Sequence, residues 1–181
     1  NNYIWQFVDK AGRAIIKEHP DKKITCLAYQ SYWEVPDKSI VPRLPDNVIV
    51  GIASLSGGGN FRKYPQPKWR KKQIDLLHRW QAITKQPLLF WTYFLMRGGS
   101  SLGRDYPRHY PAILQDFVRT HGRYGKYMFM QVVGWNFIME HLNKYILYRL
   151  LWNPDLNMDK LMDDYCMLFY GPAGRTMRRF F

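Results

Sequence analysis

The run Asn47-Val-Ile-Val-Gly-Ile-Ala53 decides the fold class of this chain. Its residues are mostly β-branched or small and apolar, which is typical of a strand buried on both faces. One similar run precedes it, Ile24-Thr-Cys-Leu-Ala-Tyr29, and two follow it, Pro87-Leu-Leu-Phe-Trp-Thr-Tyr93 and Lys126-Tyr-Met-Phe-Met-Gln131. The sequence therefore predicts four buried strands.

Stretches with helical periodicity lie between these runs. Their apolar positions are Ile4, Phe7, Val8, Ala11 and Ile15 in residues 3 to 18, then Trp69, Gln73, Leu76, Leu77, Trp80 and Ile83, and then Tyr110, Ile113, Leu114, Phe117 and Val118. Strands that alternate with helices in this way predict parallel β/α units.

The C-terminal part is predicted to be helical, over about 137 to 152, 158 to 170 and from 172 onward. Asp155 to Asn157 precede the middle helix, where short acceptor side chains cap free N–H groups. Gly171-Pro172 is expected to end that helix, because glycine tolerates positive φ and proline lacks an N–H. The predicted apolar stripe of this helix is Leu161, Met162, Tyr165, Leu168 and Phe169.

The predicted fold class is therefore α/β, as the C-terminal part of a TIM-type (β/α) barrel followed by C-terminal helices. Four strands suit half of an eight-stranded barrel, and a full barrel takes about 250 residues. We expect residues 1–181 to be a partial barrel, an excerpt of a longer chain, with the helices from about 137 to 181 closing it. An open doubly wound sheet is the alternative.

The chain is strongly basic, with 27 Lys and Arg against 14 Asp and Glu and a net charge of +13. Such a charge permits binding to nucleic acid or another polyanion. The densest basic segment, residues 62–72, is interrupted by Pro65 and Pro67, so a solvated loop and helix face explains it more simply. No nucleic-acid partner is expected, and polyanion binding through this segment is kept as an alternative.

Cysteine and histidine patterns predict no cofactor and no metal. Cys26 and Cys166 are isolated within apolar segments, which is typical of small buried residues. The five histidines lack metal-ligand spacing, and Gly57-Gly58-Gly59 lacks the lysine of a phosphate-binding loop. No apolar run is long enough to span a membrane. The oligomeric state is not indicated by the sequence.

Working residues of such barrels lie at the carboxyl ends of the strands. Aromatic and amide side chains gather there in this chain, and they suit a carbohydrate, because rings pack on the C–H face of a sugar while amides and hydroxyls bond its hydroxyl groups. The predicted substrate-binding residues are Tyr29, Tyr32, Trp91, Tyr93, Gln131 and Trp135.

Glycoside hydrolysis requires a pair of carboxylates. Glu34 is the only one close after a predicted strand end, and Glu140 lies early in the helix that follows the fourth strand. Asp163-Asp164 falls on the polar face of a helix. Solvated or capping roles explain all of them, so the catalytic residues are not assigned.

Several sequence motifs, in a fixed order along the chain, resemble those of a known family. They are Trp5-Gln-Phe-Val-Asp-Lys-Ala, His19-Pro-Asp-Lys-Lys-Ile-Thr-Cys-Leu-Ala-Tyr29, Val35-Pro36, Pro45-Asp-Asn-Val-Ile-Val50, Leu89-Phe-Trp-Thr-Tyr93, Leu150-Leu-Trp-Asn-Pro-Asp-Leu and Tyr170-Gly-Pro-Ala173. Over nearly all its length the chain resembles the domain-of-unknown-function family 4838 of bacterial carbohydrate-active proteins, relatives of which belong to glycoside hydrolase family 163.

The resemblance implies a glycan-processing, glycoside hydrolase-like barrel that acts on N-acetylglucosamine-containing glycans such as N-glycans. It implies an enzyme if an upstream barrel half supplies the carboxylates, and a periplasmic, cell-surface or secreted bacterial location. Relatives tend to be acidic near the fourth strand end, where this chain has Met130-Gln131. The alternative function is a non-catalytic carbohydrate-binding module.

Overall fold

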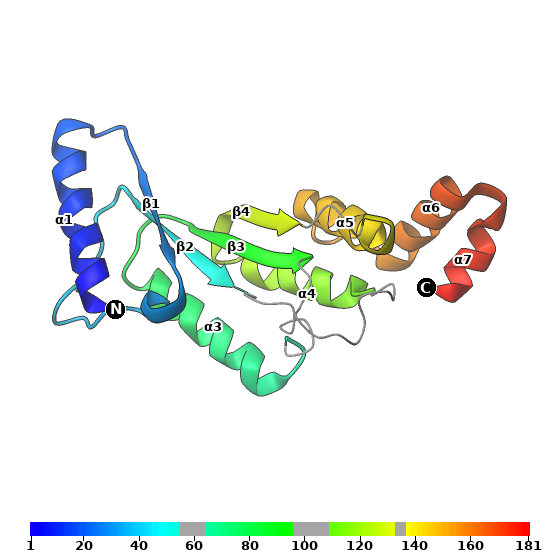
Figure 1. Cartoon of the computed structure of the whole chain (residues 1–181), viewed down its shortest axis with the longest axis horizontal. Coiled ribbons are helices and arrows are strands. Elements are labelled where there is room, and N and C mark those ends of the chain that lie inside the picture. Colours follow the sequence, from blue (N-terminus) through cyan, green and yellow to red (C-terminus); the bar gives the residue numbers. More distant parts are fainter. Residues whose placement is uncertain (55–63, 96–108, 133–136) are drawn as a thin grey trace. The chain divides into compact units, whose positions relative to one another are not determined.

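A computed structural model describes residues 1–54, 64–95, 109–132 and 137–181 (Figure 1). The chain divides into two compact units. The first comprises Asn1–Gly98 and Gly122–Val132, and the second comprises Gly99–His121 and Val133–Phe181. The closing of a barrel by residues 137 to 181 stays a prediction.

The first unit is built on a four-stranded parallel sheet. Its strands are β1 (Ile24–Ala28), β2 (Val48–Ser54), β3 (Leu88–Leu95) and β4 (Gly125–Val132). These are the four runs predicted to be strands. The order is β1-β2-β3-β4, and every neighbouring pair is parallel. The prediction of an α/β fold with a parallel sheet is confirmed.

The strand order runs in one direction. A doubly wound sheet contains a switch point at which the strand order reverses. No reversal occurs among the four described strands, each of which pairs with the next one along the chain. Because a parallel crossover is almost always right-handed, successive crossovers in one direction place their helices on the same face of the sheet.

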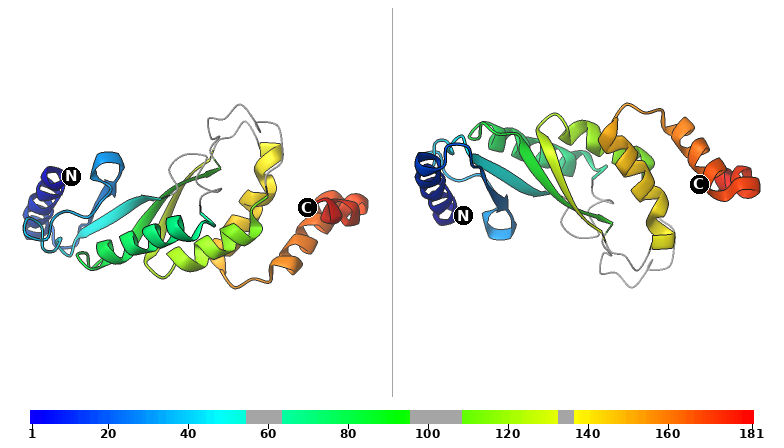
Figure 2. Two further views of the ribbon diagram at one scale, coloured as in Figure 1. Left: turned by 90° about the horizontal axis from the view of Figure 1, so that it is seen from below. Right: turned by 90° about the horizontal axis from the view of Figure 1, so that it is seen from above.

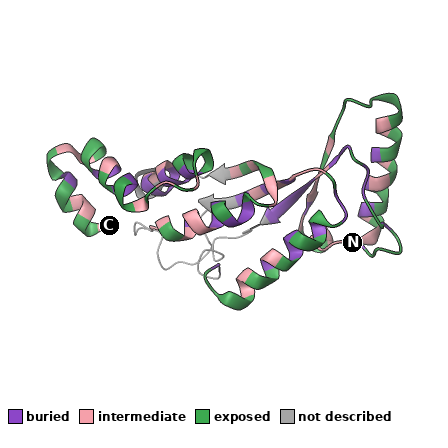
Figure 3. Cartoon of the chain, turned by 180° about the vertical axis from the view of Figure 1, so that it is seen from behind, coloured by how far each residue is buried: buried purple, intermediate pink, exposed green. Residues whose placement is uncertain are grey.

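Helices α1 (Asn2–Glu18) and α3 (Pro67–Gln81) cover one face of this sheet, called the helix face here (Figure 2). Buried residues concentrate on the strands and on the inner sides of these helices (Figure 3). The helix face and the two helices share one hydrophobic core, whose members include Trp5, Val8, Leu76, Leu77, Trp80, Ala28, Val48, Val50, Ile52, Leu88 and Phe90.

Helix α1 buries only part of the predicted face. Trp5, Val8 and Gly12 are buried, whereas Phe7 is 67% exposed. Gly12 lies against β2, because a Cβ at this position would come within 2.8 Å of a Val48 methyl group. The amide of Asn47 also donates to the Gly12 carbonyl at 3.0 Å. Gly12 therefore lies on the face of α1 that contacts the sheet, and a search for large apolar residues alone does not find this position.

The opposite side of the sheet, called the open face here, is apolar but only partly buried. By the alternation of the strands it comprises Thr25, Leu27, Ile49, Gly51, Ala53, Leu89, Trp91, Tyr127 and Phe129. Thr25, Tyr127 and Phe129 are exposed. The prediction that the strands are buried on both faces is therefore wrong for β1 and β4, which are the outer strands of the described sheet.

The second unit is helical in its described part. It contains α4 (Pro111–His121), α5 (Phe137–Trp152), α6 (Met158–Tyr170), a 3-10 turn (Gly171–Ala173) and α7 (Gly174–Phe180). The amide of Gln115 in α4 donates to the carbonyls of Pro154 and Leu156 at 3.1 and 2.8 Å. These bonds tie α4 to the segment between α5 and α6.

Helix α6 begins and ends as predicted. The Asn157 side chain accepts a hydrogen bond from the Lys160 backbone N–H at 2.9 Å, and Gly171 follows the helix at a φ of 51°. The apolar stripe is confirmed only at its start. Leu161, Met162 and Tyr165 are buried, but Leu168 and Phe169 are exposed.

Candidate functional site

The carboxyl ends of the strands carry the predicted binding residues. Tyr29 directly follows β1 with an extended backbone, at φ −144° and ψ 144°, so alternation places it on the open face. Trp91 lies in β3 on the same face. Tyr93 and Gln131 lie in β3 and β4, but their side chains are outside the described part, and Trp135 is outside it altogether.

Trp91 and Phe129 form a stacked pair on the open face. They are register partners on β3 and β4, and their ring centroids lie 3.9 Å apart at an interplanar angle of 28°. Phe129 is 45% exposed, so one side of the pair is accessible. The Trp91 indole nitrogen is buried and has no hydrogen-bond partner in the described part of the chain. A buried N–H without an acceptor is costly.

Sequence reasoning missed Phe129 and its neighbour Tyr127, which is 43% exposed. Both lie inside the predicted fourth strand, where all side chains were expected to be buried. The signal was present in the alternation of Tyr127 and Phe129 with Met128 and Met130. Met128 packs against the hydrophobic core, so the two aromatic residues point to the other face.

The loop after β1 is anchored by two buried tryptophans. The indole N–H of Trp5 donates to the Tyr32 carbonyl, and that of Trp80 donates to the Trp33 carbonyl, both at 3.1 Å. The side chain of Tyr32 packs against the core rather than standing free in solvent. The loop therefore has a fixed course, and Tyr32 contributes to it through backbone and ring together.

The carboxylates near the strand ends are paired. Glu34 forms an ion pair of 2.8 Å with Arg79 of α3. In the second unit, Asp163 receives a hydrogen bond from Arg178 at 2.7 Å and Asp164 pairs with Lys160 at 3.3 Å. The side chain of Glu140 is outside the described part. These pairings agree with structural roles, and no catalytic acid is assigned.

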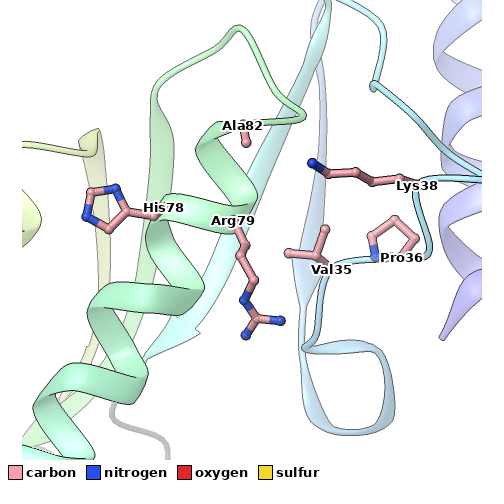
Figure 4. A pocket seen from close by; sticks show the side chains of 6 residues that line it. All are labelled: Val35, Pro36, Lys38, His78, Arg79 and Ala82. Carbon is pink, nitrogen blue, oxygen red and sulfur yellow. The ribbon is translucent and has the colours of Figure 1, made fainter.

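A pocket of about 370 Å³ lies between α3 and the segment after Trp33 (Figure 4). Its walls carry three basic side chains and three apolar residues, namely Lys38, His78, Arg79, Val35, Pro36 and Ala82. Arg79 is paired with Glu34, and the Nε2 atom of His78 lies 2.9 Å from the Tyr124 hydroxyl. Two of the three basic groups are thus engaged within the chain, and this pocket is away from the open face.

Two lysines of α3 also have partners within the chain. Lys71 pairs with Asp75 at 2.6 Å, and the Lys72 ammonium group lies 5.8 Å from the centre of the Trp33 ring. Trp69 contacts Tyr64 edge-on, with centroids 6.0 Å apart. These contacts explain the conformation of the segment without a polyanion, and polyanion binding stays a prediction.

The second unit contains a cluster of histidine and tyrosine side chains. The Tyr165 hydroxyl contacts the His141 ring nitrogen Nδ1, and His109 packs edge-on against Phe181 with centroids 4.2 Å apart. Burial lowers the pKa of His109, and the charge of His141 lowers it further. Burial and then the charge of Lys144 lower the pKa of His141. Burial therefore disfavours the charged form of both imidazoles.

Three further features bear on chemistry. Cys26 is half-buried and Cys166 is buried, both are free thiols, and burial raises the pKa of each. In the described ranges, no group of three or more His, Cys, Asp or Glu side chains is arranged to hold a metal ion. None of the described helices is both long and apolar enough to cross a bilayer.

Fold and site together define an α/β protein with a parallel four-stranded sheet and an aromatic pair on its open face. The chain belongs to the family described as domain of unknown function DUF4838, whose model matches residues 1–181. Neither a curated protein nor a solved structure gives a significant match. The expected family is confirmed, and its link to carbohydrate-active enzymes is taken up below as a proposal.

Proposed function

We propose that the open face is the interior side of a (β/α) barrel that binds N-acetylglucosamine-containing glycans at the carboxyl ends of its strands. The one-directional order β1-β2-β3-β4 supports this architecture, because the strands of a (β/α) barrel follow one another in the same way, without a switch point. The apolar, partly buried open face supports it as well, since side chains fill the interior of such barrels.

The stacked pair Trp91–Phe129 is the observation that carries the glycan proposal. A sugar presents a C–H face that packs on an aromatic ring, and Phe129 offers an accessible one. A sugar also presents hydroxyl oxygens, one of which would accept the hydrogen bond that the buried Trp91 N–H lacks. Phe129 on β4 would thus supply the stacking contact, and Trp91 on the neighbouring strand β3 would supply the hydrogen-bond donor.

Hydrolysis would require two carboxylates flanking the glycosidic bond. Glu34 is tied to Arg79, and the described strand ends offer no second carboxylate beside Trp91. We therefore propose glycan binding for the residues of this chain, with hydrolysis dependent on carboxylates supplied by further strands. A binding module without turnover is the alternative, and release of oligosaccharide by the full-length protein would exclude it.

Calorimetric titration with triacetylchitotriose tests the proposal. The variants are Phe129→Ala and Trp91→Phe, and the matched control is Tyr148→Ala, which removes an exposed aromatic ring from the helical unit. We expect Phe129→Ala to weaken binding about tenfold, which corresponds to roughly 1.4 kcal/mol. The control should bind like the wild type. Equally strong binding by all three variants would show that Phe129 and Trp91 do not contact the sugar.

A further inference from the structure

Gln30 has an unusual backbone conformation. It is the one non-glycine residue with a positive φ, at 46°, that the described ranges contain. This conformation brings Cβ close to the following carbonyl group, and among residues with side chains only Asn and Asp adopt it with any ease. Glutamine gains no local hydrogen bond that compensates. The chain thus keeps a strained residue directly after Tyr29, at the carboxyl end of β1.

The surrounding structure imposes this strain. Backbone bonds of 3.0 and 3.3 Å from Tyr32 to Tyr29 and from Trp33 to Gln30 close the turn. The indole N–H groups of Trp5 and Trp80 then donate to the carbonyls of Tyr32 and Trp33 from inside the core. Both indole rings are fully buried. Strain of this kind persists where the rest of the fold over-determines the backbone, and it concentrates at functional sites.

The strained turn presents two free polar side chains. Gln30 and Ser31 are exposed, and neither side chain has a hydrogen-bond partner within the described part. The carboxamide offers two donors and an acceptor, and the hydroxyl offers one donor and an acceptor. The nearest charged group along the loop, Glu34, is neutralised by Arg79. A neutral ligand rich in hydroxyl or amide groups matches this set.

We propose that the Gln30–Ser31 turn is a second contact element for the glycan, with the Gln30 carboxamide bonding hydroxyl or acetamido groups of the sugar. The inference rests on the proposed function, since it assumes that a glycan occupies the carboxyl end of the sheet. It adds a polar contact from the β1 end to the aromatic contact on β3 and β4. The hydrogen bonds of the loop fix the backbone from which the Gln30 side chain projects before the ligand arrives.

Two substitutions at this position separate binding from stability. Gln30→Ala removes the carboxamide and keeps a side chain at positive φ, whereas Gln30→Gly removes both the carboxamide and the strain. We expect both variants to bind triacetylchitotriose at least fivefold more weakly than the wild type. Gln30→Gly should melt roughly 2–6 °C above Gln30→Ala, because relief of such strain stabilises the folded state.

Gln81→Ala is the matched control, because it removes an exposed glutamine from α3 and should leave binding unchanged. Wild-type affinity in Gln30→Ala, with a wild-type chain that binds the sugar, would overturn this inference and leave the proposed function intact. Failure of the wild-type chain to bind the sugar at millimolar concentration would overturn the proposed function and this inference with it. Weak binding by both variants and normal binding by the control would support both.

Discussion

The indole rings of Trp5 and Trp80 lie 4.5 Å apart at an interplanar angle of 58°, and both are completely buried. They come from α1 and α3, so the pair joins the two helices that cover the sheet. Each ring also fixes a carbonyl in the loop after β1. The core of the first unit and the course of its candidate binding loop therefore depend on the same two side chains.

Trp80→Phe should separate these two contributions. Phenylalanine keeps most of the apolar volume but leaves the partly buried Trp33 carbonyl without its donor, which should lower the free energy of unfolding by about 1–3 kcal/mol. Trp80→Ala should lower it by about 3–5 kcal/mol, because it also opens a cavity. Urea unfolding of the two variants would check this order. Equal loss in both would show that the ring volume removed by Trp80→Ala contributes nothing beyond the hydrogen bond.

Two glycines should respond differently to alanine. A Cβ at Gly125 would collide with the Leu88 carbonyl oxygen, where β4 starts beside β3. Because backbone cannot move aside there, Gly125→Ala should cost about 3 kcal/mol or more.

A Cβ at Gly171 would have no atom within 4 Å, so only the backbone φ of 51° disfavours a side chain there. Gly171→Ala should therefore cost only about 1–2 kcal/mol, the usual penalty for a left-handed conformation. Thermal melts of the two variants would rank them. A larger loss for Gly171→Ala than for Gly125→Ala would contradict the close approach of β3 and β4.

The helical unit should lose stability in mild acid. The pKa values of His109 and His141 are lowered in the folded state, so between their folded values and the ordinary value near 6.5 the unfolded chain binds more protons. Their contribution is therefore complete above about pH 6.5 and is lost as the pH falls below it.

Thermal melts at pH 7.5 and pH 5.0 would measure this effect, since most carboxylates stay ionised in that interval. We expect a lower melting temperature at pH 5.0 and a smaller pH dependence in His109→Phe. His19→Phe is the control, because it removes an exposed histidine from the first unit. A pH dependence that is the same in all three chains would rule out the buried imidazoles as its source.

Arg178 links α6 and α7 by bonds of 2.7 Å to Asp163 and 3.0 Å to Asp159. Because both carboxylates are mostly exposed, water screens the interaction, and Arg178→Ala should cost only about 1 kcal/mol or less. The loss should shrink at high salt. Urea unfolding at low and high sodium chloride would test this, with exposed Arg175→Ala as the control. A loss unaffected by salt would point to packing of the arginine stem instead.

The sequence predicted most elements closely because their signals are local. The strand runs are continuous and apolar, and α6 is bounded by a capping Asn157 and by Gly171. The buried side of α1 was predicted only in part, because it is determined by partners far along the chain, Tyr32 for Trp5 and Val48 for Gly12. Such long-range contacts leave no periodic signal.

The candidate site was predicted in part. Its place at the strand ends follows from the parallel topology, and Tyr29 and Trp91 were predicted to bind substrate from that rule alone. Phe129 was missed because its alternation with Met128 and Met130 shows which residues share a face but not which face is covered. The strained φ of Gln30 could not be predicted either, since it results from bonds to Trp5 and Trp80 made by its neighbours.

The most direct test of the central claim follows the Trp91 indole N–H during a glycan titration. The chain contains seven tryptophans, and the ¹⁵N-correlated indole resonance of Trp91 is assigned by its disappearance in Trp91→Phe. We predict that triacetylchitotriose shifts this resonance as the unpaired N–H gains an acceptor. The resonances of Trp5 and Trp80, which already have acceptors, should stay in place. An unmoved Trp91 resonance at millimolar sugar would contradict glycan binding on the open face.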